Sequence, residues 1–309
     1  MAKTGHTPKK WTDTTMSDNR IEAKLYLCAT PIGNLGDITF RAAETLGKVG
    51  KIYCEDTRNT LKLLNALGIK KPLESCHEHN EQQRAAEIAD EVRGGMAVAF
   101  VSDAGMPGVS DPGSRLVREF IRRQLPFEVL PGASAAVTAW VASGLSTESL
   151  YFIGFLPRSG RERTEAVERL VSSRATSALY ESPLRVGETL REIVSALEKL
   201  GENEKNRPCC LARELTKTFE ECVRGTAAEL AERYSSEPPR GECVILLGGA
   251  GEEAEAAAAR SKLDLLLGSL IREGLSVKTA SRIAAETLGL PKNAVYQRAM
   301  ELEKENEES

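Results

Sequence analysis

Small, turn-forming and acidic residues gather between Val101 and Gly113, where the chain reads VSDAGMPGVSDPG. The apolar run at 96–101 predicts a short buried strand before this segment, and helical spacing of apolar residues after it predicts a helix over 113–123. At the carboxyl end of a strand, such a loop presents backbone N–H groups and carboxylate oxygens to a ligand. The composition therefore favours a binding loop, although glycine and proline also interrupt long connections that bind nothing.

Two further loops of the same kind follow strand-like runs. TPIGNLGD at 30–37 follows the apolar run 25–29, and PGASA at 131–135 follows FEVL at 127–130. The glycines let the backbone approach a ligand with no Cβ in the way. Because the carboxyl ends of parallel strands share one edge, the three loops predict a ligand pocket there.

Strand and helix patterns alternate from residue 25 to about 144, which predicts a parallel sheet with helices on its faces. The strands are expected near 25–29, 51–55, 96–101 and 127–130. The helices are expected near 38–48, 58–67, 80–93, 113–123 and 134–143. Asn80 is the predicted N-cap of the third helix, with Gln83 as its capping-box partner.

The pattern of strands and helices changes from residue 150. Expected strands outnumber expected helices there, which predicts a second domain with a mixed sheet. Its strands are expected near 150–155, 175–181, 207–213, 218–224 and 242–247, and its helices near 161–173, 184–199 and 226–234. The segment 249–259 resembles a linker entering a helix, and two or three helices are expected over 263–303. The predicted chain is thus an α/β protein with a disordered extension at 1–24, an N-terminal α/β domain at 25–146, a second α/β domain at 147–249 and a helical C-terminal region at 250–309.

The composition of the 309-residue chain is that of a globular protein, with 41% hydrophobic and 28% charged residues. Seven cysteines without a C-x-x-C pair indicate reduced thiols in a cytoplasm rather than a disulfide framework. Three histidines are too few for a zinc set, so no metal is expected, and no apolar run is long enough to span a membrane. The net charge of −4 gives no global attraction to nucleic acid. Local basic clusters are more often solvated helix faces, but they also suit phosphate contacts.

The usual nucleotide-binding signatures are missing, since the chain contains no G-x-G-x-x-G and no G-x-x-x-x-G-K-[ST]. It also lacks the nucleophile motif G-x-S-x-G. What remains is a predicted pocket of backbone amides, small residues and carboxylates without an anchoring lysine. That set suits S-adenosylmethionine, whose carboxylate accepts backbone N–H bonds and whose ammonium and sulfonium groups favour nearby oxygens.

Several distinctive strings occur in order along the chain: TPIGNLGD at 30–37, EDTR at 55–58, HEHN at 77–80, SDAG at 102–105, SDPG at 110–113, ESP at 181–183 and ARELTK at 212–217. Together they resemble the ribosomal RNA small subunit methyltransferase I family of the tetrapyrrole methylase superfamily. The resemblance implies a two-domain tetrapyrrole-methylase-like fold that holds S-adenosylmethionine in the cleft between domains, and a homodimer. It also implies methyl transfer to the ribose 2′-hydroxyl of a cytidine in the decoding region of 16S rRNA within the 30S subunit.

The chain departs from the family pattern at four positions. The family usually has threonine in place of Met106, proline in place of Ala29 and Ala133, and histidine in place of Leu184. Repacking absorbs the first three changes. Leu184 matters more, because a leucine side chain cannot perform any catalytic role that the family histidine has.

The resemblance and the three loops together assign site residues. The implied cofactor-binding residues are Pro31, Gly33, Leu35, Asp103, Ala104, Gly105, Met106, Ser134, Ala135, Tyr180 and Glu242. The implied RNA-binding residues are Arg58, His77, Arg115, Arg161 and Lys217, of which Arg58 has the planar guanidinium that suits a phosphate. A carboxylate must accept the 2′-hydroxyl proton, and the predicted catalytic candidates are Glu55, Asp56 and Glu181. Loop capping by Asp103, pairing of Glu55 and Asp56 with Arg58, and a strand end at Glu181 are the structural alternatives.

Two other functions stay open at this point. One is a methyltransferase that acts on a tetrapyrrole or another small acceptor. The other is a non-catalytic protein that binds RNA or S-adenosylmethionine without turnover.

Overall fold

The computed structural model describes residues 21–146 and 148–307. The chain forms two compact units: a first unit of the residues up to Ala142 together with Ala212–Glu221, and a second unit of Ser143–Leu211 together with Cys222 and the residues after it. Most of the predicted extension at 1–24 lies outside the described residues, although Ile21 packs against the first hydrophobic cluster. The other predicted domain boundaries stay predictions.

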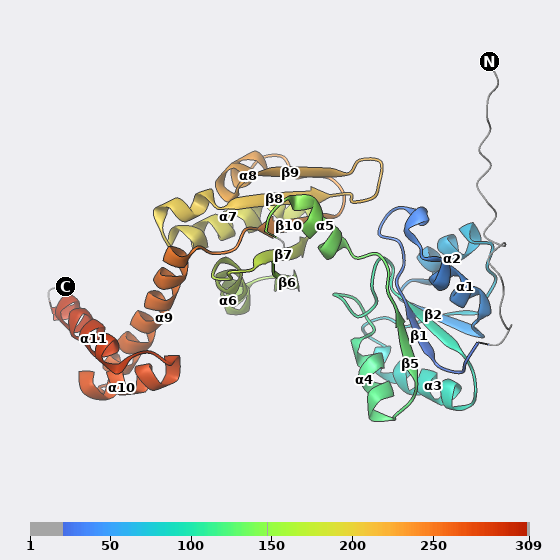
Figure 1. Ribbon diagram of the computed structural model, residues 1–309, viewed down its shortest axis with the longest axis horizontal. Coiled ribbons are helices and arrows are strands. Elements are labelled where there is room, and N and C mark those ends of the chain that lie inside the picture. The colour runs from blue at the N-terminus through green and yellow to red at the C-terminus, as the bar shows by residue number, and fades with distance from the viewer. Residues whose placement is uncertain (1–20, 147, 308–309) are drawn as a thin grey trace, which may run out of the picture. The chain divides into compact units, whose positions relative to one another are not determined.

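The first unit contains a parallel sheet of five strands in the order β3-β2-β4-β1-β5 (Figure 1). The strands are β1 (Leu25–Cys28), β2 (Lys51–Cys54), β3 (Leu73–Ser75), β4 (Val98–Val101) and β5 (Phe127–Leu130). The helices are α1 (Phe40–Lys48), α2 (Thr57–Ala66), α3 (Glu81–Arg93), α4 (Ser114–Arg122) and α5 (Ala135–Ser143). The predicted alternation of strand and helix is confirmed.

Helices cover both faces of this sheet. Tyr26 and Cys28 of β1 point into a cluster with α1 and α2, whereas Leu25 and Leu27 point into a cluster with α3 and α4. Because both faces are buried at the centre of the sheet, β1 (LYLC) and β4 (VAFV) carry no charged residue and are buried along their whole length. The three layers fix the strand ends and therefore the loops that follow them.

Strand β3 was not among the predicted strands. It is three residues long, LES, and all three are only half-buried. It pairs with β2 alone and so forms the edge of the sheet. A short edge strand with one apolar residue carries no alternating pattern, which is why the sequence did not reveal it.

The predicted capping box at Asn80 is wrong. Asn80 makes no side-chain cap bond to α3. Its amide oxygen instead accepts from the His77 N–H at 2.8 Å, and its amide nitrogen donates to the Ser75 carbonyl. The first helical residue, Glu81, is buried, and one of its carboxylate oxygens accepts from the backbone N–H groups of Gly113, Arg115 and Leu116 at 2.9–3.2 Å. Glu81 thus caps α4 rather than α3.

The second unit contains a mixed sheet in the order β6-β7-β10-β8-β9, in which β6 and β7 are parallel and β7 and β10 antiparallel. The strands are β6 (Leu150–Phe155), β7 (Thr176–Glu181), β8 (Pro208–Arg213), β9 (Glu221–Thr226) and β10 (Cys243–Leu247). The helices α6 (Gly160–Val171), α7 (Val186–Glu198) and α8 (Ala227–Arg233) share one hydrophobic cluster with this sheet. The predicted mixed sheet is confirmed, although β9 begins three residues later than expected.

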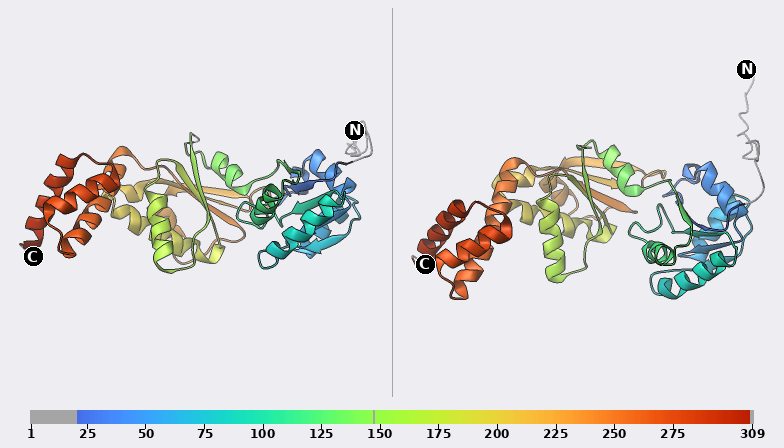
Figure 2. Two further views of the ribbon diagram at one scale, coloured as in Figure 1. Left: turned by 90° about the horizontal axis from the view of Figure 1, so that it is seen from below. Right: turned by 60° about the horizontal axis from the view of Figure 1, so that its bottom comes forward.

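Three C-terminal helices close the chain: α9 (Glu252–Arg272), α10 (Val277–Leu288) and α11 (Lys292–Glu307). They pack on one another around a small apolar cluster (Figure 2). The Arg298 guanidinium of α11 makes a two-pronged ion pair with Asp264 of α9 at 2.7 Å. The linker expected at 249–259 is mostly helix, because α9 starts at Glu252. Among the described residues, none of the helices has the length and apolarity that a membrane span requires.

Candidate functional site at the carboxyl edge of the first sheet

The three predicted loops lie together at one edge of the first sheet. The loops after β1 and β4 are joined by two backbone hydrogen bonds between Thr30 and Gly105, at 2.9 and 3.0 Å. The loop after β5 is equally close to the first loop, since a Cβ on Gly132 would lie 2.7 Å from the Ala29 Cβ. The expectation of three adjacent loops at the carboxyl edge is therefore met.

Asp103 joins this edge to the loop after β2. One oxygen of its carboxylate accepts from the Asp56 N–H at 3.0 Å, and the other accepts from the side-chain amide of Asn59 at 2.9 Å. These bonds hold the residues after β2 at the same edge. The carboxylates of Glu55 and Asp103 are consequently neighbours.

The acidic groups at this edge have contrasting protonation behaviour. Hydrogen bonds from the Arg58 side chain lower the pKa of Asp56 to about 2. Burial, and after it repulsion from Asp103, raises the pKa of Glu55. Burial and then repulsion from Glu55 raise the pKa of Asp111 to about 6. A carboxylate that binds a proton more readily is a better general base, so Glu55 is favoured over Asp56 for that role.

The raised pKa of Asp111 predicts a pH-dependent stability. The folded protein binds more protons than the unfolded chain between pH 4 and 6, so its stability falls as the pH rises through that range. With allowance for solvent screening, Asp111→Asn is expected to stabilise the protein by about 1 kcal/mol at pH 7.5. Urea unfolding should show this gain shrinking at pH 4.5. The exposed Asp37→Asn is the matched control, and an equal gain at both pH values would contradict the account.

Segment 212–221 contacts the first loop within the same unit. A Cβ on Gly33 would lie 2.4 Å from the Lys217 Cγ and 2.9 Å from the Thr216 Oγ1, so only glycine fits this approach. Thr216 has a positive φ of 66°, and its buried hydroxyl has no hydrogen-bond partner in the part of the chain that the structure describes. Lys217, a predicted RNA-binding residue, is ion-paired with Glu214 at 2.9 Å.

The remaining predicted residues of the first unit flank the same edge. Leu35 is 53% exposed in the loop after β1, and Ser134 directly precedes α5. His77 follows β3, and its ring Nδ1 is buried without a partner among the described residues. Arg115 lies in the first turn of α4. Pro31, Ala104, Met106 and Ala135 belong to the three loops or to the helix start that follows them.

Tyr180, Glu181, Glu242 and Arg161 belong to the second unit. Glu181 ends β7 with a side chain that is only 3% exposed. Its carboxylate accepts from the Ser182 N–H at 2.8 Å and from the Thr189 hydroxyl at 2.6 Å. A carboxylate enclosed in this way is suited to fixing the turn after β7.

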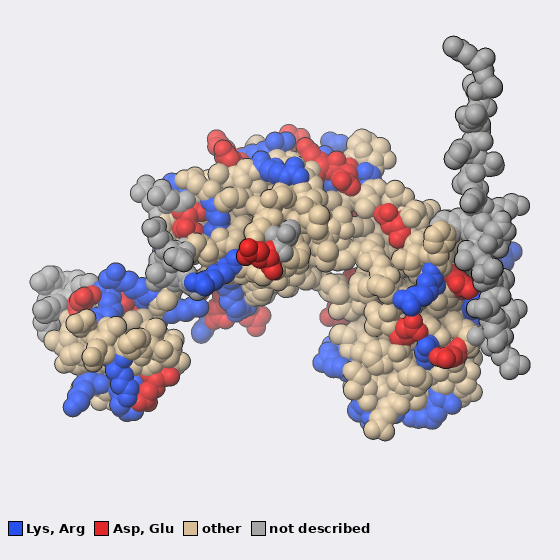
Figure 3. All heavy atoms as spheres, viewed as in Figure 1, with Lys and Arg blue, Asp and Glu red and all other residues tan. Residues whose placement is uncertain are grey.

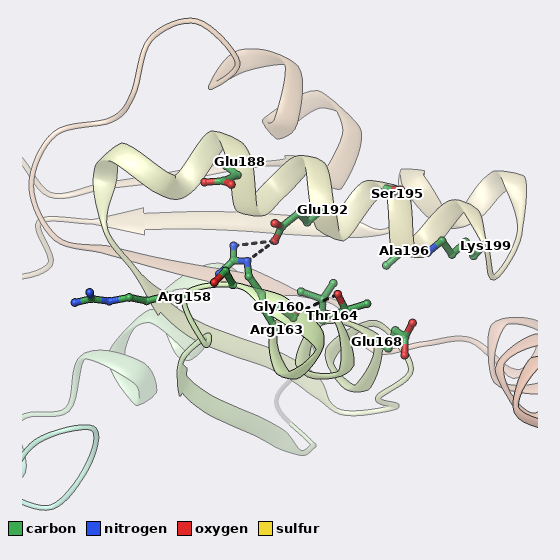
Figure 4. Close-up of a pocket in the computed structure, with 12 residues that line it drawn as sticks. Arg158, Gly160, Arg163, Thr164, Glu168, Glu188, Glu192, Ser195, Ala196 and Lys199 are labelled. Carbon is green, nitrogen blue, oxygen red and sulfur yellow. Dashed lines mark hydrogen bonds and ion pairs between the residues drawn. The ribbon is translucent and has the colours of Figure 1, made fainter.

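Sequence reasoning missed the partners of Glu181. The Thr189 hydroxyl accepts from the buried Arg163 at 2.8 Å, and Arg163 in turn pairs with Glu192. Figure 4 shows Arg163 reaching from α6 toward Glu192 on α7, in a pocket of about 330 Å³ between the two helices. Arg163 lies in a local basic cluster of the kind expected on a solvated helix face, but its side chain is buried among apolar helix positions. No sequence pattern indicated this burial.

Comparison with known proteins agrees with this architecture. Residues 24–231 match the family described as Tetrapyrrole (Corrin/Porphyrin) Methylases, and residues 253–303 match one described as RsmI C-terminal HTH domain. A Ribosomal RNA small subunit methyltransferase I of Mesorhizobium japonicum is 43% identical over 91% of this chain and 93% of its own. The chain belongs to the ribosomal RNA small subunit methyltransferase I family.

Further relatives of this family member support the same assignment. The Ribosomal RNA small subunit methyltransferase I of Halalkalibacterium halodurans is 46% identical over 75% of this chain and 78% of its own. Among solved structures, the fold is similar to that of uroporphyrin-III C-methyltransferase from Thermus thermophilus in complex with S-adenyl homocysteine. That match has a TM-score of 0.52 at 18% identity and covers 75% of this chain and 99% of the other. The α/β fold of the tetrapyrrole methylases is thereby confirmed.

Proposed function

We propose that this family member transfers a methyl group from S-adenosylmethionine to the ribose 2′-hydroxyl of a cytidine in the decoding region of 16S rRNA. The observation that carries the proposal is the similarity over nearly the whole chain to proteins named for the small-subunit ribosomal RNA. The geometry of the carboxyl edge supports it, because the loops that resemble the family lie together there.

The charge of the carboxyl edge suits S-adenosylmethionine. In the described part of the chain, no lysine or arginine forms an ion pair with Glu55, Asp103 or Asp111, and Arg58 interacts with Asp103 only at longer range, so the three carboxylates leave this edge acidic. A ligand with a sulfonium and an ammonium group supplies the missing positive charge. When bound, this cofactor provides a methyl group on a positively charged sulfur. We propose that S-adenosylmethionine is held by Asp103 and by the loops around Gly33, Gly105 and Ser134. Cofactor binding by Tyr180 and Glu242 stays a prediction.

The residues of this edge contribute positioning and proton transfer. Methyl transfer from sulfur requires the acceptor oxygen in line with the breaking bond, so a rigid site provides much of the acceleration. Glu55 is proposed to accept the proton of the 2′-hydroxyl at its carboxylate, and Asp103 to position it through the loop after β2. Asp56, held by Arg58, is proposed to orient that arginine rather than to act as the base.

RNA binding is proposed to rely on local contacts. Figure 3 shows basic and acidic side chains interspersed over each unit in that view. The Arg58 side chain is 85% exposed and points its guanidinium out beside the carboxyl edge with Asp56 as its anchor. Arg58, His77, Arg115, Arg161 and Lys217 remain the proposed RNA contacts. A homodimer likewise remains a prediction.

The proposal is tested with purified full-length protein, labelled S-adenosylmethionine and 30S subunits that lack the modification. We expect label in 16S rRNA, at the 2′-oxygen of one cytidine in the decoding region, by mass mapping of nuclease fragments. Transfer to uroporphyrinogen and not to 30S subunits would favour the small-acceptor alternative. Binding of both ligands without transfer would favour the non-catalytic alternative.

A further inference from the structure

The carboxyl ends of β6 and β7 form a surface within the second unit. The two strands are parallel, and Phe155 lies opposite Tyr180 in their register. Beyond them the chain continues into Arg158 on one side and into the turn Pro183–Arg185 on the other. The Arg185 guanidinium donates to the Arg158 carbonyl at 3.3 Å, which joins the two loops. Of the residues here, only Tyr180 has a predicted role in the proposed function, as a cofactor-binding residue.

An exposed aromatic ring lies at this strand end. Phe155 is 58% exposed although it is one of the larger apolar residues of the chain. Its ring packs edge-on against Tyr180, with centroids 5.5 Å apart, and Tyr180 is packed in the same way against Phe152 at 4.9 Å. Phe155 is therefore braced on one side and open on the other. An aromatic ring that is held in place and exposed to solvent offers a surface on which a nucleobase can stack.

Two arginines accompany the ring. No hydrogen bond or ion pair within the described residues engages the Arg158 side chain, and Figure 4 shows it pointing away from the pocket between α6 and α7. The Arg185 side chain is 30% exposed and lies 4.0 Å from the Glu181 carboxylate. Three residues of extended chain span about 10 Å at most, so the Phe155 and Arg158 side chains start from the same strand end.

The buried groups below this surface make it rigid. Glu181 binds the Ser182 N–H and the Thr189 hydroxyl, and Arg163 donates to both Thr189 and the Pro157 carbonyl at 2.8 and 3.0 Å. These bonds link the loop before α6 to the turn before α7. Because these buried hydrogen bonds fix the backbone of both loops, little backbone entropy is lost when the exposed side chains bind a partner.

We propose that Phe155, Arg158 and Arg185 form a binding surface for single-stranded RNA, with the ring stacked on a base and the guanidinium groups on the flanking phosphates. The combination of an open aromatic ring with cations is that of sequence-tolerant RNA binding. The inference rests on the proposed function, since the RNA is the methylation substrate, and it assigns part of the substrate binding to residues of the second unit.

The test measures the Kd for unmodified 30S subunits at several KCl concentrations, with the full-length protein. Phe155→Ala is expected to weaken binding about tenfold or more with no change in the salt dependence. Arg158→Ala is expected to weaken it and to reduce the slope of log Kd against log [KCl] by about 0.7, the value for one phosphate contact on a single strand. Phe155→Tyr keeps the ring and should restore affinity. Arg93→Ala on α3 and Leu265→Ala on α9 are matched controls for exposed charge and exposed apolar area.

The outcomes separate this inference from the proposed function. If the native protein methylates 30S subunits and both variants bind as it does, the RNA surface is refuted while the methyltransferase proposal stands. Loss of affinity in Phe155→Ala together with a changed slope of log Kd against log [KCl] would also contradict stacking, because stacking on a base releases no counterions. Absence of both transfer and binding by the native protein would overturn the two proposals together.

Discussion

Glu55→Gln is expected to slow methyl transfer by about 10²–10⁴-fold while the affinities for S-adenosylmethionine and for 30S subunits stay within about twofold. The amide keeps the size and hydrogen-bonding capacity of the side chain but cannot accept the 2′-hydroxyl proton. Burial and the nearby Asp103 raise the pKa of Glu55, so the native rate should increase with pH as this group loses its proton and then level off. Single-turnover rates against pH, with calorimetry for the cofactor, measure both effects.

The matched control for Glu55→Gln is Asp56→Asn at the next residue. Arg58 lowers the pKa of Asp56, so this carboxylate is a weak proton acceptor and its loss should act mainly on RNA affinity. A native-like rate for Glu55→Gln would remove Glu55 from the mechanism. A rate loss confined to Asp56→Asn would transfer the role of base to Asp56.

Glu81→Ala is expected to lower the free energy of unfolding of the first unit by about 3 kcal/mol. The buried carboxylate accepts three backbone N–H groups at the start of α4, and alanine leaves these donors without an acceptor in a place that water does not reach. The positive end of the helix dipole also loses its counter-charge. Urea unfolding followed by circular dichroism measures the change.

Two comparisons sharpen the Glu81 experiment. Glu81→Gln keeps one acceptor oxygen and loses the charge, so about 1 kcal/mol of destabilisation is expected. Glu78→Ala, at an exposed position three residues earlier, should have no effect beyond about 0.5 kcal/mol. An unfolding midpoint for Glu81→Ala equal to that of the native protein would show that water or another group satisfies the donors.

The sequence predicts the carboxyl edge of the first sheet well, because its signals are local. Apolar runs end in glycine-rich loops at 30–37, 102–113 and 131–135, and parallel pairing necessarily brings such loops to one side. The elements that were missed depend on distant partners. Strand β3 exists through its pairing with β2, and Glu81 caps a helix that begins 33 residues after it.

The same reasoning explains what the sequence left open at Glu181. A glutamate at a strand end is compatible with a catalytic, capping or buried role, and the choice depends on Thr189 and Arg163 from other elements. Their contacts arise from how α6 and α7 pack on β7. Periodicity reveals which face of a helix is apolar but not which polar side chain that face encloses.

Segment 212–221 gives the chain an unusual order of assembly. The residues up to Ala142 emerge first during synthesis, yet the segment that covers Gly33 is complete only at Glu221, about 80 residues later, after Ser143–Leu211 of the second unit have been made. At about 5–20 residues per second, the ribosome needs roughly 4–16 s to add them. The N-terminal fold is thus completed late in translation, and a fragment ending at Ala142 lacks the covering of its own first loop.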